Sequence, residues 1–311
     1  MNPVAMQGCG NTFLLDDLLS KKNDEDNPLK CIEIGDDKAL NEVLVNLIQN
    51  HFQLNKTTQT ENTQSDNTQY VPDGFLFLLP SENADVRMKY FDIDRFTLEP
   101  YLCDMCGNGI RCLSRYFFDS YNSLAHIQVE TDDGVKAVII KGDQVEVNMG
   151  PPREFSLVDP DRELYFVNTS LAHVVMFLDA FDIENKYHLN MIRSIGSDVA
   201  WDGKLAEKVG HPEGLHLNAV KVYSPHAISI VTFEPGVDDL TLACGTGATV
   251  AAYVSAQVKG GMYPIFVQNR GGTLKIEERN SSLRMTGPAE YIRNGVGEGT
   301  INLVKVVTME K

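Results

Sequence analysis

The chain has 311 residues, 43% of them hydrophobic and 23% charged, which is enough for about two globular domains with ordinary cores. Its formal net charge of −16 argues against binding to nucleic acid or to acidic membranes, because both need basic faces. No apolar run reaches the ~18 residues of a membrane span, and the first residues do not resemble a signal peptide. We therefore expect a cytoplasmic protein.

The first part of the chain combines structured segments with polar ones. Residues 7–16 read as a glycine turn followed by a short buried strand, and 21–30 as a charged loop. Apolar residues at helical spacing predict an amphipathic helix over 36–50. The next segment, 51–70, is rich in Asn, Gln and Thr, which predicts a flexible polar insertion.

Strand patterns then alternate with helices in each half of the chain. The expected strands of the first half are 73–79, 86–91, 127–130, 135–140 and 145–149, with a helix at 110–118. Those of the second half are 174–178, 219–223 and 228–233, with helices at 184–195 and 248–258 and a last strand at 300–307.

An internal duplication explains this repetition. Cys106 begins a Cys-Gly-x-Gly stretch that runs into a helix pattern, and Cys244 begins another 138 residues later (244 − 106 = 138). We therefore predict an α/β (α+β) fold of two similar lobes, each a mixed sheet. The first lobe would span 1–150 with a C-terminal return of 292–311, and the second 151–291, with the boundary at Pro151-Pro152.

Glycines at the start of a helix let a ligand approach free backbone N–H groups, which favour an anion such as a carboxylate. The same position lowers the pKa of a thiol. Each duplicated stretch could therefore combine an anion site with a reactive sulfur. Disulfides are not expected among the cysteines, because the sequence lacks a secretion signal. Cys103-Asp104-Met105-Cys106 is formally a CxxC, but a zinc site would lack ligands, because no second CxxC and no His-x-x-x-His pattern follows. We expect Cys9, Cys31 and Cys112 to be buried, and we expect no metal.

With both cysteine stretches in view, the chain resembles the diaminopimelate epimerase family over nearly its whole length. Matching segments occur in family order: Gly10-Asn11-Thr12-Phe13, Asp73-Gly74, Arg87 to Phe91, Met105 to Cys112, Val147 to Gly150, His173, Pro212-Glu213-Gly214, Leu242 to Ala248 and Met285 to Ala289. The resemblance implies a cofactor-free enzyme with a central helix in each lobe. It also implies interconversion of LL- and meso-diaminopimelate, a step of lysine biosynthesis.

The resemblance implies roles for individual residues. Cys106 and Cys244 would exchange protons with opposite faces of the substrate α-carbon, one as thiolate and the other as thiol. The substrate-binding residues it implies are Asn11, Asp92, Gly107, Asn108, His173, His216, Glu234, Gly245 and Thr246. From the residues alone, other readings stay open: Glu234 could be a surface carboxylate, Asn11 a turn residue and His173 a core histidine.

The chain departs from the family where the far end of the substrate is held. A family arginine is replaced by Pro235, and family asparagines by Asp92, Leu171 and His216. An insertion of about five residues within 95–104 brings Arg95, which could restore the lost cation. Alternatives therefore remain open: a racemase of another amino acid such as histidine, a proline-racemase-like isomerase, or an inactive amino-acid-binding relative. The partner would be a small amino acid, and a homodimer is compatible with the sequence.

Overall fold

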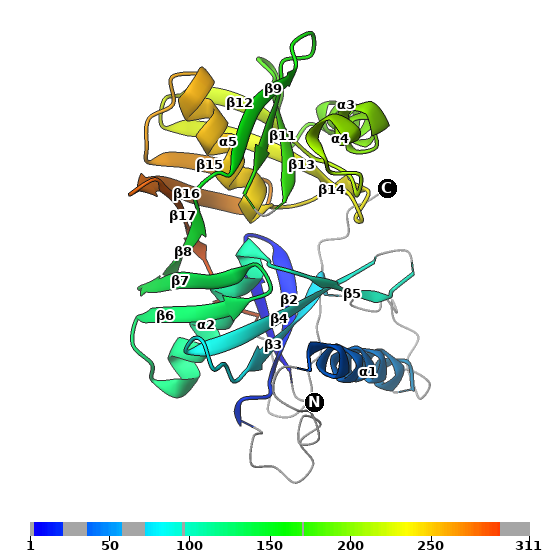
Figure 1. Ribbon diagram of the computed structural model, residues 1–311, viewed down its shortest axis with the longest axis vertical. Coiled ribbons are helices and arrows are strands. Elements are labelled where there is room, and N and C mark those ends of the chain that lie inside the picture. Colours follow the sequence, from blue (N-terminus) through cyan, green and yellow to red (C-terminus); the bar gives the residue numbers. More distant parts are fainter. Residues whose placement is uncertain (1–2, 21–35, 58–71, 95–96, 170, 293–311) are drawn as a thin grey trace.

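The computed structural model describes residues 3–20, 36–57, 72–94, 97–169 and 171–292, with α1 seen only as backbone after residue 50. Figure 1 shows two lobes, one above the other, joined where β8 and β17 meet. The first lobe contains β1 (Val4–Gly8), β2 (Asn11–Asp17), α1 (Asp37–Thr57), β3 (Gly74–Leu79), β4 (Val86–Ile93), β5 (Pro100–Cys103), α2 (Gly107–Tyr121), β6 (His126–Thr131), β7 (Gly134–Lys141) and β8 (Gln144–Gly150).

The second lobe repeats much of this order. It contains β9 (Glu154–Asp159), β10 (Leu164–Asn168), β11 (Ala172–Phe177), α3 (Lys186–Ala200), α4 (Gly203–Val209), β12 (His216–Ser224), β13 (Ala227–Glu234), β14 (Asp239–Leu240), α5 (Gly245–Val258), β15 (Ile265–Asn269), β16 (Gly272–Arg279) and β17 (Ser282–Pro288). A short β18 (Glu290–Tyr291) then pairs with β1, so the chain is back in the first lobe by residue 290.

Strand pairing shows the duplication directly. In the first lobe, β1–β2 is antiparallel, β2–β3 parallel, β3–β4 antiparallel and β4–β6 parallel. In the second lobe, β10–β11, β11–β12, β12–β13 and β13–β15 follow the same sequence of directions. Antiparallel pairing of β8 with β17 joins the two sets into one sheet of 18 strands among the described residues. The predicted mixed α/β fold with two similar lobes is confirmed.

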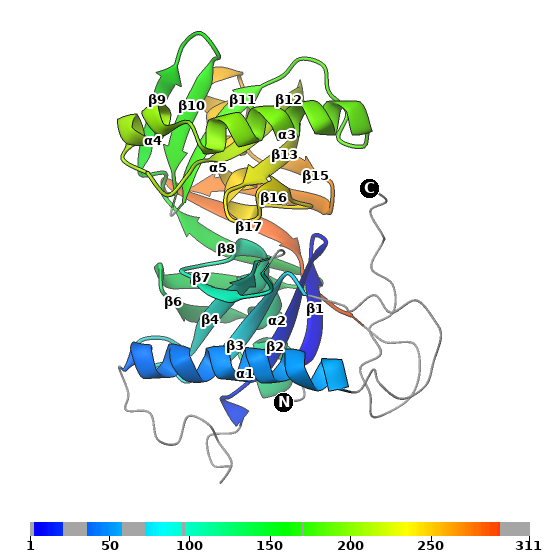
Figure 2. The ribbon, with the colours of Figure 1, turned by 90° about the vertical axis from the view of Figure 1, so that its right-hand side faces the viewer.

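Each lobe has a buried helix at its centre and helices on its outer face. The first eight residues of α2 are buried, and so are ten residues of α5, which is rich in alanine and apolar on most sides. The helix α1 lies across the outside of the first lobe, as α3 does across the second (Figure 2). Leu40, Leu44 and Ile48 of α1 pack against Phe75 and Phe77 of β3, following the helical spacing seen in the sequence.

Several boundaries differ from the sequence-based expectations. The first helix continues to Thr57, so the beginning of the expected insertion is helical, and its remainder lies outside the described residues. The strands β1, β5, β9, β10, β14 and β18 and the helix α4 were not predicted. The expected loop at 21–30, the strand at 300–307 and, except for Ile292, the return at 292–311 lie outside the described residues. No helix in the described part of the chain is long and apolar enough to cross a membrane.

Candidate active site

Both duplicated cysteines occupy the residue that precedes a buried helix. Cys106 caps α2 with an extended backbone, and its Sγ accepts a hydrogen bond from Gly109 N–H at 3.3 Å. Cys244 caps α5 in the same conformation and accepts from Gly247 N–H at 3.4 Å. A capping side chain takes one of the free N–H donors of the first turn. The first helical hydrogen bonds run from Ile110 N–H to Cys106 O and from Ala248 N–H to Cys244 O, so α2 and α5 begin three residues earlier than expected, at Gly107 and Gly245.

The two helices meet at their first residues. A Cβ on Gly245 would lie 3.3 Å from Cα of Gly107 and 3.0 Å from the sulfur of Met285. A Cβ on Gly107 would lie 3.4 Å from Cα of Gly245. These distances are tighter than ordinary contacts, so a side chain at either position would require Met285 or the facing helix start to give by a few tenths of an ångström. Glycine permits this close approach. The positive ends of both helix dipoles therefore point into one small region of the molecule.

Asn108 forms hydrogen bonds across the junction of α2 and α5. Its Nδ2 donates to Ala243 O at 3.2 Å and to Asn11 Oδ1 at 3.0 Å, so one side chain links α2, β2 and the segment before α5. Its Oδ1 is buried with no hydrogen-bond partner in the described structure. The structure thus brings Asn11, Gly107, Asn108 and Gly245 together beside the two cysteines.

Burial dominates the acidity of the two thiols, contrary to the expectation of a lowered pKa. Desolvation raises the pKa of Cys106 to about 12; N–H groups of Gly109 and Asn108 lower it, and the Asp92 and Glu234 charges raise it. Desolvation, and then the charge of Glu234, raise the pKa of Cys244 well above its usual value. Helix donors oppose this rise at both sites but are outweighed.

Glu234 and Thr246 distinguish the surroundings of Cys244 from those of Cys106. The Glu234 carboxylate raises the pKa of the Cys244 thiol, mainly through its negative charge, and so favours the protonated sulfur. Thr246 Oγ1 lies 3.3 Å from Cys244 Sγ. Thr241 Oγ1 donates to Glu234 Oε1 at 2.7 Å and orients that carboxylate at the end of β13. Both predicted residues, Glu234 and Thr246, therefore lie beside the second cysteine.

Asp92 lies in β4, where it is the register partner of Tyr101 in β5. Burial raises its pKa to about 6, and Asp73 raises it further, whereas Ile93 N–H and the hydroxyls of Tyr101 and Tyr90 lower it. Its charge also contributes to the raised pKa of Cys106. Asp92 is thus an electrostatic neighbour of the first cysteine.

The two predicted histidines form a separate pair in the second lobe. His173 in β11 and His216 in β12 are in register, with ring centres 4.7 Å apart. Burial lowers the pKa of His216 to about 4 and that of His173 well below its usual value, so both rings are neutral. None of the described hydrogen bonds of either ring reaches a cysteine.

Asn218 connects this histidine pair to the site and was missed from the sequence. Its Nδ2 lies 3.1 Å from His173 Nδ1, and its Oδ1 accepts from Thr232 at 2.9 Å. A Cβ on Gly247 would lie 2.3 Å from that same Oδ1, so Asn218 packs against the first turn of α5. The available signal was an amide in the middle of an apolar strand, which must find partners when it is buried.

Tyr101 and Arg111 were also missed. The first lies in the insertion, which has no repeat counterpart to mark it, and the second sits within the first cysteine stretch as a completely buried cation. Arg95, expected to supply a cation, lies outside the described residues.

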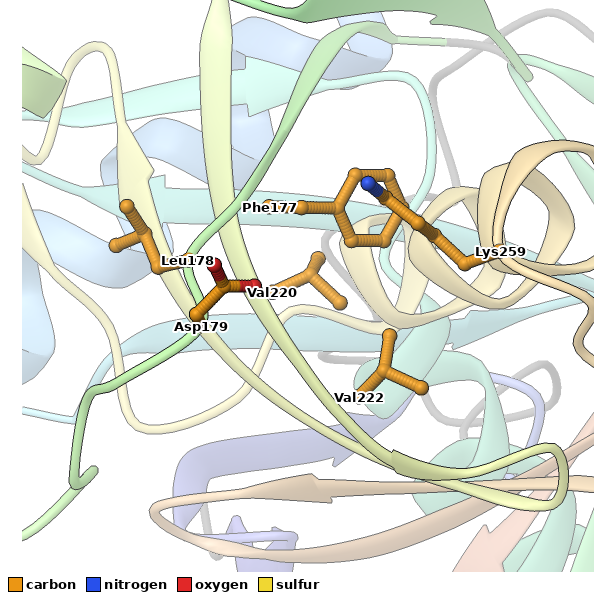
Figure 3. A pocket seen from close by; sticks show the side chains of 6 residues that line it. All are labelled: Phe177, Leu178, Asp179, Val220, Val222 and Lys259. Carbon is orange, nitrogen blue, oxygen red and sulfur yellow. The ribbon is translucent and has the colours of Figure 1, made fainter.

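A different pocket lies in the second lobe, away from the cysteines. It is lined by Phe177, Leu178, Asp179, Val220, Val222 and Lys259 (Figure 3). The Lys259 ammonium sits over the Phe177 ring, 5.0 Å from its centre, so that cation already has a partner. No group of three or more metal-ligating side chains occurs within the described ranges. The junction of α2 and α5, with its two cysteines, is therefore our candidate for the active site.

Solved structures with this fold are isomerases and a phenazine biosynthesis protein. A probable proline racemase from Agrobacterium radiobacter matches with a TM-score of 0.57 at 14% identity, covering 97% of this chain and 94% of that one. A Bacillus anthracis phenazine biosynthesis protein matches with a TM-score of 0.56 at 14% identity, covering 94% of this chain and 98% of that one. These likenesses establish the two-lobed fold.

Sequence relatives establish the class and the family. A diaminopimelate epimerase from Archaeoglobus fulgidus is 31% identical over 246 residues, 72% of this chain and 80% of that protein. One from Methanothrix thermoacetophila is 33% identical over 72% of this chain and 79% of that protein, and one from Elusimicrobium minutum is 28% identical over 95% and 99%. No protein-family model matches. The protein is an isomerase, an amino-acid epimerase. It belongs to the diaminopimelate epimerase family.

Proposed function

We propose that the enzyme interconverts LL- and meso-diaminopimelate, in lysine biosynthesis, through proton exchange at the α-carbon by Cys106 and Cys244. The observation that carries this proposal is the meeting of two cysteine-capped helix N-termini at Gly107 and Gly245. A single capped helix could be a structural feature. Two thiols held at one junction supply the pair of acid/base groups that inversion at carbon requires.

The proton balance of the proposed reaction is complete without a cofactor. One cysteine, as thiolate, takes the α-proton: its S–H bond forms while the C–H bond breaks. The other cysteine, as thiol, delivers its proton to the opposite face of the carbon. The two sulfurs finish with exchanged protonation states, and the reverse reaction starts from that state.

The surroundings of the two sulfurs favour Cys106 as the first base and Cys244 as the first acid. Cys106 accepts hydrogen bonds from the backbone N–H groups of Gly109 and Asn108, which lower its pKa and stabilise a thiolate. Cys244 is held as a thiol by Glu234. Binding the substrate ammonium near Glu234 would offset that carboxylate's charge and lower the pKa of both thiols.

The helix starts would bind the substrate carboxylate. The N–H groups of the first turns of α2 and α5 and both helix dipoles favour an anion at their junction. They would also stabilise the negative charge that develops as the α-proton leaves. Glu234, oriented by Thr241, would hold the α-ammonium.

Diaminopimelate is the first candidate substrate, because relatives of the chain are named diaminopimelate epimerase. Racemisation of another amino acid, such as histidine, is the second candidate, since Asp92 and Pro235 replace the family asparagine and arginine near the far end of the substrate. We further propose that the enzyme acts in the cytoplasm, alone or as a homodimer.

Proton NMR of candidate amino acids in deuterated buffer tests the two-cysteine mechanism. Cys106→Ala and Cys244→Ala should each slow exchange of the α-proton by roughly 10²–10⁴-fold or more, because each removes one acid/base group. Cys112→Ala, which removes a buried thiol further along α2, is the matched control and should keep its activity. Near-normal exchange in either of the first two variants would rule out the two-base mechanism, and exchange with no amino acid would reject the enzymatic proposal.

A further inference from the structure

A pair of opposed strand residues in the second lobe is polar, whereas the equivalent pair in the first lobe is aliphatic and aromatic. Asn218 in β12 and Thr232 in β13 are register partners, so their side chains lie on the same face of the sheet. The equivalent strands of the first lobe, β3 and β4, pair Leu76 with Tyr90 in the same way. The two lobes therefore share this position but not its chemistry.

The third residue of each buried helix, a glycine, packs directly against one member of this pair. A Cβ on Gly247 of α5 would lie 2.3 Å from Asn218 Oδ1, and a Cβ on Gly109 of α2 would lie 2.9 Å from Leu76 Cδ2. Gly247 is also the residue whose N–H donates to Cys244 Sγ at 3.4 Å. The side chain of Asn218 therefore limits where this donor of the second cysteine can lie.

The amide of Asn218 is completely buried and is held by hydrogen bonds at both of its ends. Its Oδ1 accepts from Thr232 Oγ1 at 2.9 Å, and its Nδ2 donates to Val174 O at 3.2 Å. The same Nδ2 lies 3.1 Å from His173 Nδ1. Thr232 Oγ1 would itself lie 3.1 Å from a Cβ on Gly247. Because rotation of the amide would leave buried polar groups unpaired, Asn218 presents a fixed surface to the first turn of α5.

We infer that Asn218, held by Thr232, is a positioning residue for proton transfer by Cys244. It keeps the first turn of α5 where Gly247 N–H reaches the Cys244 sulfur. In either direction of the reaction Cys244 is a thiolate at one stage, and a fixed backbone donor stabilises that charge. Cys106 has Leu76 at the equivalent place, so the two sulfurs are supported by different means. The inference rests on the proposed function, because it assigns a part in the same proton transfer.

Two substitutions of Thr232 separate positioning from stability. Thr232→Val keeps the shape of the side chain and removes the donor to Asn218, whereas Thr232→Ser keeps the donor and removes a methyl group. In Thr232→Val, kcat for α-proton exchange should fall by about tenfold with KM within about twofold, because the substrate still binds. Thr232→Ser should keep kcat within about threefold of the wild type, although its lost methyl lowers the thermal stability.

Alkylation of the two thiols gives a second measurement that needs no substrate. Iodoacetamide followed by peptide mass mapping reports Cys244 and Cys106 separately in one sample, and only the thiolate reacts. Thr232→Val should slow modification of Cys244 relative to Cys106 by about threefold to tenfold, and Thr232→Ser should keep the wild-type ratio. The matched control is Ser255→Ala, which removes a buried hydroxyl bonded to Ala251 O further along α5 and should change neither measurement.

The outcomes distinguish the inference from the proposed function. An unchanged kcat and thiol ratio in Thr232→Val, or activity that follows thermal stability in both Thr232 variants, would overturn the inference and leave the epimerase proposal standing. If the wild type exchanges no amino acid, the proposed function fails, and the thiol ratio still decides how Cys244 is held. Thermal unfolding verifies that each variant folds. Asn218→Leu, which copies Leu76 of the first lobe, should slow Cys244 in the same selective way and provides the test if Thr232→Val does not fold.

Discussion

Asp92 is a residue whose ionised form is destabilised by its place in the fold. Its carboxyl lies in β4 with its pKa raised to about 6 from 3.8, mainly by burial. The sequence pointed to this position through the family resemblance. It could not reveal the raised pKa, because burial depends on β5, which carries no repeat or strong strand pattern in the sequence.

Replacing Asp92 by asparagine should stabilise the protein at neutral pH. Below the unfolded pKa of 3.8 the carboxyl is protonated in both states, and above about 6 it is ionised in both. Since the folded pKa is the higher one, the wild type loses stability as pH rises between these values. Asp92→Asn removes that loss, by roughly 1–3 kcal/mol in the free energy of unfolding at pH 7.5. Urea unfolding at pH 4 and pH 7.5 measures the difference.

The stability change has a clear control and a clear contrary result. Asp143→Asn, at an exposed turn, should leave the pH dependence of unfolding unchanged. A variant Asp92→Asn that is no more stable than the wild type at pH 7.5 would mean that the carboxylate is adequately solvated or paired. Greater stability combined with slower α-proton exchange would show a charge retained for function rather than folding.

At the scale of elements, the contact between α2 and α5 makes the glycines after the cysteines sensitive positions. Gly245→Ala would place a Cβ 3.0 Å from the Met285 sulfur and 3.3 Å from Cα of Gly107, tighter than ordinary contacts. The neighbours must give by a few tenths of an ångström, whereas misplacement of reacting groups by about 1 Å can lower a rate ~10²-fold. We therefore expect kcat for α-proton exchange to fall by roughly several-fold to tenfold, while circular dichroism shows an intact fold.

Gly203→Ala is the matched control for this change. Gly203 is also the first residue of a helix, α4, directly after the capping Asp202, but no atom lies within 4 Å of an added Cβ. Alanine there should leave activity unchanged. Equal kcat in Gly245→Ala and wild type would show that the helix N-termini can separate without harm to catalysis.

The elements that the sequence revealed are those with strong local signals. Alternating apolar residues gave β6, β7 and β8 after the first central helix, and helical spacing gave α1. By contrast, β9 has four exposed residues in a row and α4 is only seven residues long, so neither carries a periodic pattern. Their positions depend on pairing with β10 and on the capping Asp202, which are tertiary and capping effects.

At the scale of the whole molecule, the duplication predicted two similar lobes but not how they are joined. One joint is the antiparallel pairing of β8 with β17. Another is Arg111 of α2, which is completely buried. Its Nε donates to Pro288 O at 3.1 Å, and its Nη1 donates to Gly107 O at 3.1 Å. These contacts link residues up to 177 positions apart, a separation at which local sequence patterns carry no information.

Arg111 also supports the catalytic junction from behind. Its Nη1 lies 3.6 Å from the sulfur of Met285, the residue wedged against Gly107 and Gly245. A guanidinium can serve these separate acceptors at once because its donors form a rigid planar fork, whereas a lysine ammonium is a compact point charge. A positive charge alone therefore cannot replace the hydrogen bonds that the Arg111 guanidinium makes to Pro288 O and Gly107 O.

Arg111→Lys should consequently destabilise the protein despite keeping the charge. Buried carbonyl groups that lose a charged donor cost about 1.5–3 kcal/mol each, so we expect a loss of roughly 2–4 kcal/mol in the free energy of unfolding. Urea unfolding measures it, and Arg153→Lys, at a side chain that is 57% exposed, should change little. Unchanged stability in Arg111→Lys would show that the positive charge, rather than the paired hydrogen bonds of the guanidinium to α2 and the end of β17, joins the lobes.

If these hydrogen bonds join the lobes, Arg111→Lys should also lose α-proton exchange at temperatures where it remains folded, because Met285 would no longer hold Gly107 and Gly245 together.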